Sequence, residues 1–338
     1  MKRIHIFIIA VVAFIALAAV TASIYYHINR KNTNITDAAK KSDTSSSSAI
    51  KGVSPALTIK GDTYPFTLTD ALGDTIVIEK KPEKIISLAP AATEILFKIG
   101  VGDRLVGVTE YCNYPPEVLE LPKIGSYDTP SIELISAMKP DLVISVRGNK
   151  REVLQKIKEL GIKVISIDPV SFESLCSAMS IIGKVTDATE DESAIKKINE
   201  TVNNIKTTSN EFKKKPLVLL LLGLDESMFT AGSYTTVDEI IKIAGGANLS
   251  DSTSGWYQIS MEVVSAKNPD IIILSKYEGA QPLEDIKEKL LQDNKWKTIS
   301  AVKNGDIYYI NGEHINVSPR LLNGLEDIHA IIADFQDK

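Results

Sequence analysis

Short apolar runs alternate with longer segments of helical periodicity along most of the chain. Residues 85–88 and 105–109 are apolar runs of strand length. Between them, residues 92–99 repeat apolar positions at helical spacing and end at Gly100. Strands that alternate with helices in this way form parallel sheets covered by helices on both faces. The pattern therefore predicts an α/β fold built on central parallel sheets.

The same alternation extends in both directions. Alternating apolar positions around Gly73-Asp74 indicate a β-hairpin within residues 64–80. Further helices are expected at 132–138, 150–160, 237–244 and 261–267 and from Pro319 onward, and further strands at 142–145, 164–167, 217–222, 271–274 and 307–310.

One long helix is predicted between the two α/β parts. Residues 190–213 contain neither Gly nor Pro, and Ile195, Ile198, Val202 and Ile205 recur there at helical spacing. Lysines gather at the end of the segment, where the helix dipole stabilises positive charge. We expect this helix to bridge two lobes.

An internal repeat supports the division into two lobes. Residues 131–144 match residues 260–273 at a constant offset of 129, with seven of fourteen positions identical. Both copies predict a helix, a Pro-Asp turn and a buried strand. Convergence of helix-to-strand units is the alternative explanation, but the shared Glu and Pro-Asp favour two related lobes. Two lobes joined by a helix leave a cleft, and ligands of α/β sheets bind beyond the carboxyl ends of the strands.

The N-terminus carries a long apolar segment. Residues 6–26 hold no charge, and this run exceeds the ~7–15 residues of a signal-peptide core and matches the ~20 that span a bilayer. We expect an uncleaved membrane anchor that leaves the large domain outside the cytoplasm; a signal cleaved near residues 19–22 is the alternative. No cysteine follows the run, which excludes a lipoprotein anchor. The polar residues 28–56 predict a flexible stalk.

Composition narrows the function. The net charge of −5 shows no basic excess, so nucleic acid is not an expected partner. Cys112 and Cys176 are the only cysteines, which excludes a multi-cysteine metal site and leaves one disulfide open. The sequence contains no Gly-x-Ser-x-Gly, Walker, His-Glu-x-x-His or Cys-x-x-Cys motif, so a binding protein is expected rather than an enzyme. Of four histidines, only His314 is a candidate site residue, and no metal site is expected.

Candidate ligand contacts follow the predicted strands. Pro90 and Ala91 precede a helix start, where small residues let a ligand approach backbone N–H groups; an ordinary helix start is the alternative. Tyr111 and Asn113 lie in a proline-stiffened loop that offers a flat apolar surface and polar groups to a large planar ligand; a packed loop is the alternative. The remaining candidates are Tyr127, Arg147 and Gly148 in the first lobe and Phe229, Trp256, Tyr257 and His314 in the second.

Glu133 and Glu262 occupy the same position of the repeat, near a helix start. The helix dipole alone favours a carboxylate there by ~0.3–1 kcal/mol, which is the purely structural explanation. Equivalent surface carboxylates on two lobes also suit a partner with two-fold symmetry and two basic pockets. We expect these two residues to dock onto such a partner.

These motifs together resemble a known family. Over roughly residues 64–338 the chain is similar to the solute-binding proteins of ABC importers for cobalamin, siderophores and haem. Within that class, the Tyr-rich loop before Pro115-Pro116 and the runs 147–149 and 318–320 are most similar to vitamin B12 binders. The chain departs from them at Val146, where an aromatic is expected, at Tyr127, where a tryptophan is expected, and in segment 312–316.

The resemblance implies two Rossmann-like lobes, a rigid bridging helix and little hinge closure. It implies a monomer without a cofactor that binds a corrinoid through Tyr111, Tyr127, Phe229 and Trp256 and docks onto an ABC permease and its ATPase subunits. The expected parts are an anchor or signal at 1–27, a stalk at 28–63, an N-terminal lobe at 64–188, the bridging helix at 189–214 and a C-terminal lobe at 215–338.

A corrinoid is the expected ligand, and a ferric siderophore and haem are the alternatives within the same class. A ferric siderophore is often anionic and needs several cationic side chains, for which only Arg147 and Arg320 are candidates. Haem needs an axial ligand, for which His314 is the candidate. A surface enzyme or chelatase on a related two-lobe fold is the most distant alternative.

Overall fold

The computed structural model describes residues 57–224, 228–276 and 281–338. All the described residues belong to one compact unit. The expected anchor and residues 28–56 of the expected stalk lie outside the described residues. Within the rest of the expected stalk, Thr58–Lys60 form a strand instead, so the folded part begins before the predicted residue 64. Among the helices that are described, none combines the length and the apolar character that a membrane crossing requires.

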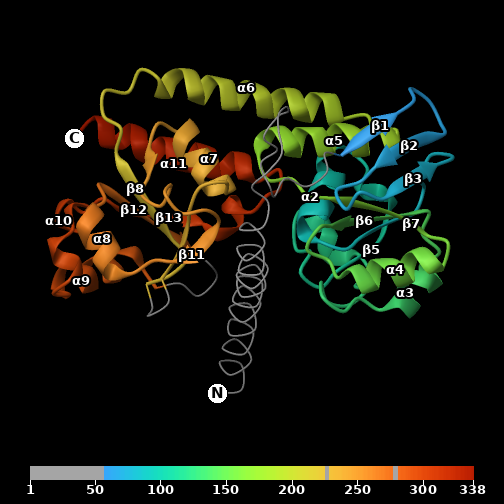
Figure 1. The fold of residues 1–338 in the computed structure, drawn as a ribbon, viewed down its shortest axis with the longest axis horizontal. Helices are drawn as coiled ribbons and strands as arrows, with labels where there is room; N and C mark the ends of the chain where they lie inside the picture. Colours follow the sequence, from blue (N-terminus) through green and yellow to red (C-terminus); the bar gives the residue numbers. More distant parts are fainter. Residues whose placement is uncertain (1–56, 225–227, 277–280) are drawn as a thin grey trace, which may run out of the picture. The chain divides into compact units, whose positions relative to one another are not determined.

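The N-terminal lobe is built on a parallel sheet (Figure 1). Its four strands run in the order β5-β4-β6-β7, and all their pairings are parallel. The strands are β4 (Ile85–Ser87), β5 (Leu105–Val108), β6 (Leu142–Val146) and β7 (Lys163–Ile167), and the helices are α2 (Pro90–Lys98), α3 (Ile132–Met138), α4 (Arg151–Glu159) and α5 (Phe172–Thr186). An antiparallel sheet precedes them, formed by β1 (Thr58–Lys60), β2 (Phe66–Thr69) and β3 (Thr75–Ile78). The hairpin predicted within 64–80 is thus confirmed.

The C-terminal lobe repeats the arrangement with a parallel sheet in the order β10-β8-β12-β13. Its strands are β8 (Leu217–Leu221), β10 (Ala247–Asn248), β12 (Ile271–Lys276) and β13 (Ile307–Asn311), and its helices are α7 (Thr236–Ile243), α8 (Met261–Lys267), α9 (Leu283–Gln292), α10 (Ser300–Asn304) and α11 (Leu321–Gln336). A short antiparallel pair, β9 (Phe229–Ala231) and β11 (Trp256–Gln258), lies beside it. The α/β fold with two parallel sheets is confirmed.

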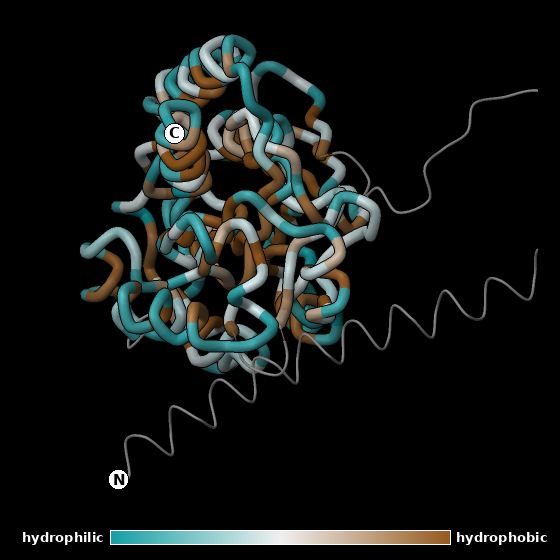
Figure 2. Tube along the Cα trace, turned by 90° about the vertical axis from the view of Figure 1, so that its left-hand side faces the viewer, coloured by the Kyte–Doolittle hydropathy of each residue, from teal (hydrophilic) through white to brown (hydrophobic). Residues whose placement is uncertain are grey.

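Both parallel sheets are covered on their two faces, because alternate strand residues enter different core clusters. On β12, Ile271 and Ile273 pack into one cluster while Ile272 and Leu274 pack into another. Figure 2 shows the apolar segments running through the interior. Fully buried strands explain why the sequence showed continuous apolar runs rather than alternation.

The two copies of the repeat have the same local structure. Ser131 caps α3 by accepting a hydrogen bond from the Leu134 N–H at 3.2 Å, and Ser260 caps α8 in the same way from Val263 at 3.4 Å. Both helices end in a left-handed residue, with φ of 51° and 49°. The Pro-Asp turn follows in each copy.

The aspartate of each Pro-Asp turn ties the repeat to the neighbouring strand. The Asp141 carboxylate accepts hydrogen bonds from the backbone N–H groups of Glu83 and Lys84, just before β4, at 2.9 and 3.0 Å. The Asp270 carboxylate accepts one from Leu217, the first residue of β8, at 2.7 Å. The conserved dipeptide of the repeat therefore sets the register between two central strands in each lobe.

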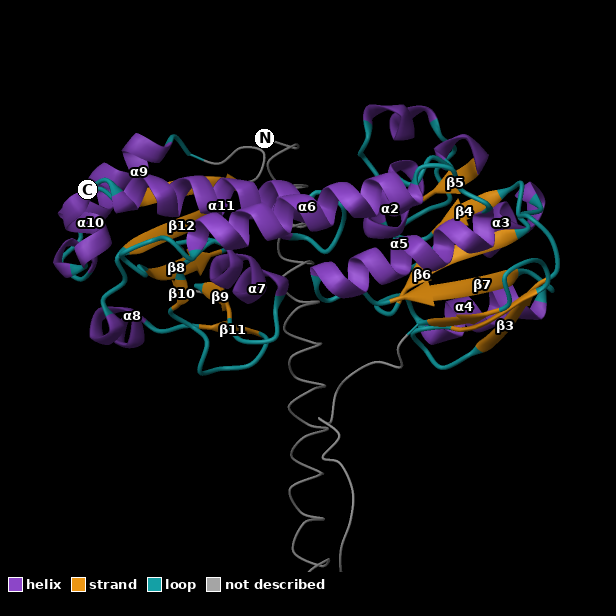
Figure 3. Cartoon of the chain, turned by 90° about the horizontal axis from the view of Figure 1, so that it is seen from above, coloured by secondary structure: helices purple, strands orange, loops and turns teal. Residues whose placement is uncertain are grey.

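The bridging helix is α6 (Asp191–Ser209), which packs against α5 and α11 (Figures 1 and 3). It ends four residues before the predicted boundary at 213. Beyond the helix, the partly buried ring of Phe212 stacks on His329 of the C-terminal lobe, with 5.4 Å between ring centroids. Helix α5 was not predicted, although its buried residues, among them Leu175, Met179 and Ile182, recur at helical spacing.

Candidate functional site

Helix α2 begins at the carboxyl end of β4 without a side-chain cap. Pro90 is its first residue, and Thr93 does not cap it. The Thr93 hydroxyl instead donates to the Ala89 carbonyl at 3.1 Å and contacts Ser87 and Cys112. Pro90 and Ala91, both half-buried, therefore present a helix N-terminus whose first N–H groups no side chain occupies.

The loop after β5 is anchored by one buried residue, and the residues on either side of it are exposed. Cys112 is buried, its sulfur lies 3.2 Å from the Thr109 hydroxyl, and its carbonyl accepts a hydrogen bond from Lys123 at 2.9 Å. Its neighbours point outward, so Asn113 is exposed and Tyr111 is 60% exposed. Cys112 and Cys176 are both free, which answers the question of a disulfide.

Tyr127 and the turn after β6 come together as their positions at strand ends suggested. Asn149, which is buried, accepts from the Val146 N–H at 2.9 Å and donates to the carbonyls of Leu88 and Tyr127. A Cβ atom on Gly148 would lie 2.2 Å from the Tyr127 hydroxyl oxygen, so only glycine allows this approach. Burial, followed by the charges of nearby aspartates, raises the pKa of Tyr127 to about 12, and the phenol stays protonated.

Arg147 extends from the same turn toward the first residue after β7. Its guanidinium pairs with the Asp168 carboxylate at 3.2 Å, and half of the Arg147 side chain is exposed. The negative charge of Asp168 offsets the positive charge of Arg147, which an anionic ligand would need for its own binding.

In the C-terminal lobe, the aromatic candidates divide between two faces of the β9–β11 pair. Trp256 pairs with Ala231 and Gln258 pairs with Phe229, so Trp256 and Phe229 share one face. Trp256 is 41% exposed. Tyr257 belongs to the opposite face, where it packs against a core cluster. Trp256 and Phe229 are thus the better placed of the three to meet a ligand.

His314 lies on a short 3-10 helix, Gly312–Ile315, that packs on α11. Its Nδ1 is 2.8 Å from the Asp327 carboxylate of α11. Gly324 of α11 approaches the His314 carbonyl so closely that a Cβ atom there would lie 2.2 Å away. His314 therefore joins two elements of its own lobe.

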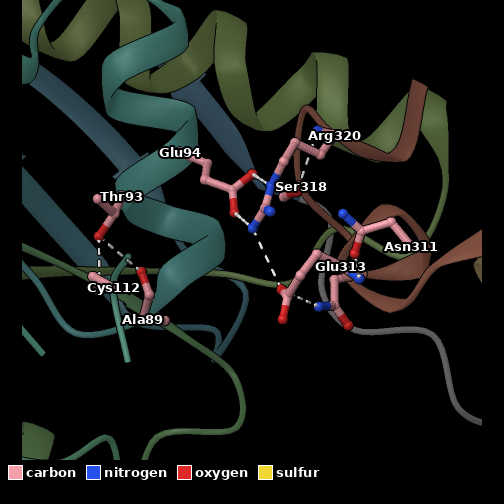
Figure 4. Close-up of polar contacts among 9 residues, drawn as sticks. Ala89, Thr93, Glu94, Cys112, Asn311, Glu313, Ser318 and Arg320 are labelled. Carbon is pink, nitrogen blue, oxygen red and sulfur yellow. Dashed lines mark hydrogen bonds and ion pairs between the residues drawn. The ribbon is translucent and has the colours of Figure 1, made fainter. Parts of the chain in front are cut away.

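The strongest polar cluster of the described residues is one that the sequence did not predict (Figure 4). Arg320 binds Glu94 in a bidentate pair, with Nε–Oε2 at 3.0 Å and Nη2–Oε1 at 2.5 Å, and Glu313 at 3.4 Å. The guanidinium also lies over the ring of Tyr114, 4.5 Å from its centroid. Burial alone would lower the pKa of Arg320, but the hydrogen bond and charge of Glu94, with Glu313, raise it above its ordinary value.

The side chains of this cluster are largely shielded from water. The exposed fraction is 4% for the Glu94 side chain and 12% for that of Arg320. Glu313 is itself held by Asn311, which accepts from its N–H at 2.9 Å, and by Asn316, which donates to its carboxylate at 3.1 Å. Glu94 falls in the predicted helix 92–99 and Arg320 in the run 318–320, but 226 residues separate them, and no periodicity connects positions so far apart.

Glu133 and Glu262 are exposed carboxylates in the first turns of α3 and α8. Hydrogen bonds from its own backbone N–H and from the Ser131 hydroxyl lower the pKa of Glu133. The Ser260 hydroxyl and its own N–H lower the pKa of Glu262. Both side chains are therefore charged at neutral pH. Beside Glu262 lies an open groove of about 490 Å³, whose lining includes Met228, Met261, Asp293, Lys295 and Trp296.

Comparisons with known proteins match this architecture. The family described as periplasmic binding protein matches residues 85–313, more than half of the chain. The Bacillus subtilis protein named "Uncharacterized ABC transporter substrate-binding lipoprotein YvrC" is 29% identical over 279 residues, which cover 80% of this chain and 86% of that protein.

Two solved structures are similar over nearly their whole length. The periplasmic vitamin B12 binding protein BtuF of Vibrio cholerae is 27% identical with a TM-score of 0.64, and the match covers 76% of this chain and 99% of that one. The periplasmic heme-binding protein RhuT from Roseiflexus sp. RS-1, in apo form, is 25% identical with a TM-score of 0.64, covering 75% and 99%.

Proposed function

Because the chain belongs to the periplasmic binding protein family, we propose that it captures cobalamin or a related corrinoid between its two lobes and delivers it to the permease of an ABC importer. The name of the Bacillus subtilis relative supports the ABC transporter, and the Vibrio cholerae structure supports the corrinoid. In this proposal the protein acts outside the cytoplasm, and the apolar segment 6–26 tethers it to the membrane.

The observation that carries the choice of ligand is the state of the two arginines near the strand ends. Arg147 pairs with Asp168, and Arg320 is neutralised by Glu94 and Glu313. Exposed aromatic side chains are found in both lobes: Tyr111 lies in the loop whose Tyr114 ring is stacked on Arg320, and Trp256 lies on β11. Aromatic surfaces with compensated charge suit a large, flat ligand without strong negative charge, which favours a corrinoid over an anionic ferric siderophore.

Haem is the second candidate, because a haem-binding protein is among the similar structures. Haem brings two carboxylates and needs an axial ligand. His314, the residue expected for that role, packs on α11 with its Nδ1 at the Asp327 carboxylate, a contact that is also common in metal-binding histidines. The observation that favours the corrinoid is instead that Arg147 and Arg320 already pair with carboxylates, which suits the two haem carboxylates less well.

Calorimetry tests the choice directly. The compact unit, residues 53–338, is titrated with cyanocobalamin, cobinamide, haem and a ferric siderophore. We expect stoichiometric heat with the corrinoids and weaker or no heat with the others. Heat with haem or the siderophore alone would replace the proposed ligand, and turnover of any of them would make the protein an enzyme.

A variant pair locates the ligand. Trp256→Ala should weaken corrinoid binding by about 30-fold, because truncating a tryptophan anchor costs ~2 kcal/mol or more. The matched control is Leu160→Ala, which removes a similarly exposed apolar side chain after α4. Equal affinities of the two variants would place the ligand away from the β9–β11 pair.

A further inference from the structure

The Glu94–Arg320 pair joins the two lobes. Glu94 lies in α2 of the N-terminal lobe, and Arg320 directly precedes α11 of the C-terminal lobe. The pair is bidentate and nearly completely buried, and Glu313 completes the coordination of the guanidinium from the C-terminal side. Breaking a buried pair leaves an uncompensated charge, so separating the lobes at this point is strongly unfavourable.

Arg320 also connects the C-terminal lobe to the loop after β5. Its guanidinium stacks on Tyr114, and the same loop carries Tyr111 and Asn113, the predicted ligand contacts. Cys112, between them, is fixed from below by Thr93, which neighbours Glu94 in α2. One cation thus holds α2 and the loop in a fixed position relative to α11.

Other contacts already hold the lobes together without this pair. Helix α6 packs against α5 and α11, and the Phe172 N–H of α5 donates to Glu239 of α7 at 3.1 Å. An apolar pair of similar volume would add stability at least as well as a buried ion pair does. A directional, charged contact instead defines one geometry and opens as a unit when that geometry is lost.

We propose that Glu94 and Arg320 form an interlobe clamp, which fixes the separation of the lobes before the ligand arrives and positions the loop that carries Tyr111. Release of the ligand then requires this pair to open. The positioning of the loop rests on the proposed ligand binding, whereas the fixed separation of the lobes does not.

Double electron–electron resonance measures the clamp without any ligand. Nitroxide labels are placed on the full chain in detergent at Gln155 of α4 and Gln292 of α9, both exposed and in different lobes, with Cys176 replaced by serine. We expect one narrow distance distribution for the clamped protein and a distribution at least about twofold wider for Glu94→Gln. The control, Asp187→Asn, removes the exposed Lys81–Asp187 ion pair within one lobe and should change nothing.

Two further variants protect the test against loss of folding. Glu94→Met with Arg320→Met replaces the pair by apolar side chains and should keep the melting temperature while widening the distribution. The exchange of Glu94→Arg with Arg320→Glu should narrow it again. A narrow distribution in the double methionine variant, or in a folded Glu94→Gln protein, would reduce the pair to a structural contact and overturn the proposal.

Ligand affinity provides the second readout. In the folded variants that lose the clamp, the Kd for cyanocobalamin should rise about tenfold, because the loop is no longer held by Arg320. Widened distances with unchanged affinity would keep the clamp and overturn only its role in positioning the loop. Absence of cyanocobalamin binding in the parent protein would count against the proposed ligand and leave the distance result standing.

Discussion

The regions around Glu133 and Glu262, which are expected to dock onto the permease, share the same backbone structure but differ in the residues around each carboxylate. Around Glu133 and Glu262 the serine cap, the left-handed helix end and the Pro-Asp tie are the same. Lys156 is the basic residue that acts on Glu133, whereas Glu262 borders the groove with Asp293 and Trp296. The repeat thus preserves the local structure that orients each carboxylate, while the residues around the carboxylate differ between the two lobes. A two-fold symmetric partner would therefore meet two carboxylates with the same local backbone and different neighbours.

The largest effect is expected when both carboxylates are removed. Glu133→Ala with Glu262→Ala should abolish uptake of the ligand into cells and leave its affinity intact, because both are exposed carboxylates in the first turns of α3 and α8 and neither belongs to the predicted ligand contacts. Radiolabelled ligand uptake and calorimetry measure the two quantities. The matched control is Glu152→Ala with Glu284→Ala, which removes first-turn glutamates of α4 and α9. Normal uptake in the first double variant would end the docking assignment.

The single variants should be unequal. Both carboxylates are exposed in the free protein, but a basic side chain of the partner that entered the groove beside Glu262 would be shielded from water there. Glu262→Ala is therefore expected to reduce uptake about tenfold more than Glu133→Ala. The positive charge of Lys295, near Glu262, is offset by the negative charge of Asp293. The N–H groups of Trp296 and Lys295 lower the pKa of Asp293. Equal losses in the same uptake assay would show that the groove plays no part.

The shared scaffold should respond equally in both lobes. Ser131→Ala and Ser260→Ala each remove a helix cap and should lower the free energy of unfolding by about 1 kcal/mol, measured by chemical denaturation. The controls, Ser136→Ala and Ser265→Ala, change repeat-equivalent exposed serines within α3 and α8 and should not destabilise the protein, because alanine has the higher helix propensity. A large difference between the two cap variants would mean that the lobes do not share this device.

The smallest effect concerns protonation. Ser131→Ala should raise the pKa of Glu133 toward its ordinary value, and Ser260→Ala should do the same for Glu262, since each hydroxyl hydrogen-bonds the carboxylate. A folded-state pKa below the unfolded one means that each carboxylate adds stability above its unfolded pKa and loses it as pH falls through the folded pKa. Carboxyl NMR titration measures the pKa values of Glu133 and Glu262. If neither pKa changes in the variants, the serine hydroxyls are not the cause of the lowered values.

The sequence predicted the parallel strands well because buried strands leave continuous apolar runs. It missed helix α5, although the buried residues of that helix recur at helical spacing and Ser171 and Ser174 form a capping box that marks its start. The division of Trp256 and Tyr257 between two faces follows from strand alternation, but β11 is three residues long and its partner β9 begins 27 positions earlier.

The candidate site was predictable in its parts and not in its assembly. Strand ends located Tyr127 and Gly148, and the structure brings them into contact. The pairing of Glu94 with Arg320 depends on how two lobes meet, and neither local propensity nor the repeat contains that information.

The 19 residues of α6 also have a mechanical consequence. A straight helix of that size is a beam of roughly 28 Å, and tilting such a beam by about 5° moves its far end by about 2.5 Å. That displacement is comparable to the length of a hydrogen bond. A partner that binds both lobes would therefore need to tilt α6 by only a few degrees to move one lobe by about the length of a hydrogen bond. Transport would then act on the bound ligand through a small rotation of the lobes rather than through a large displacement.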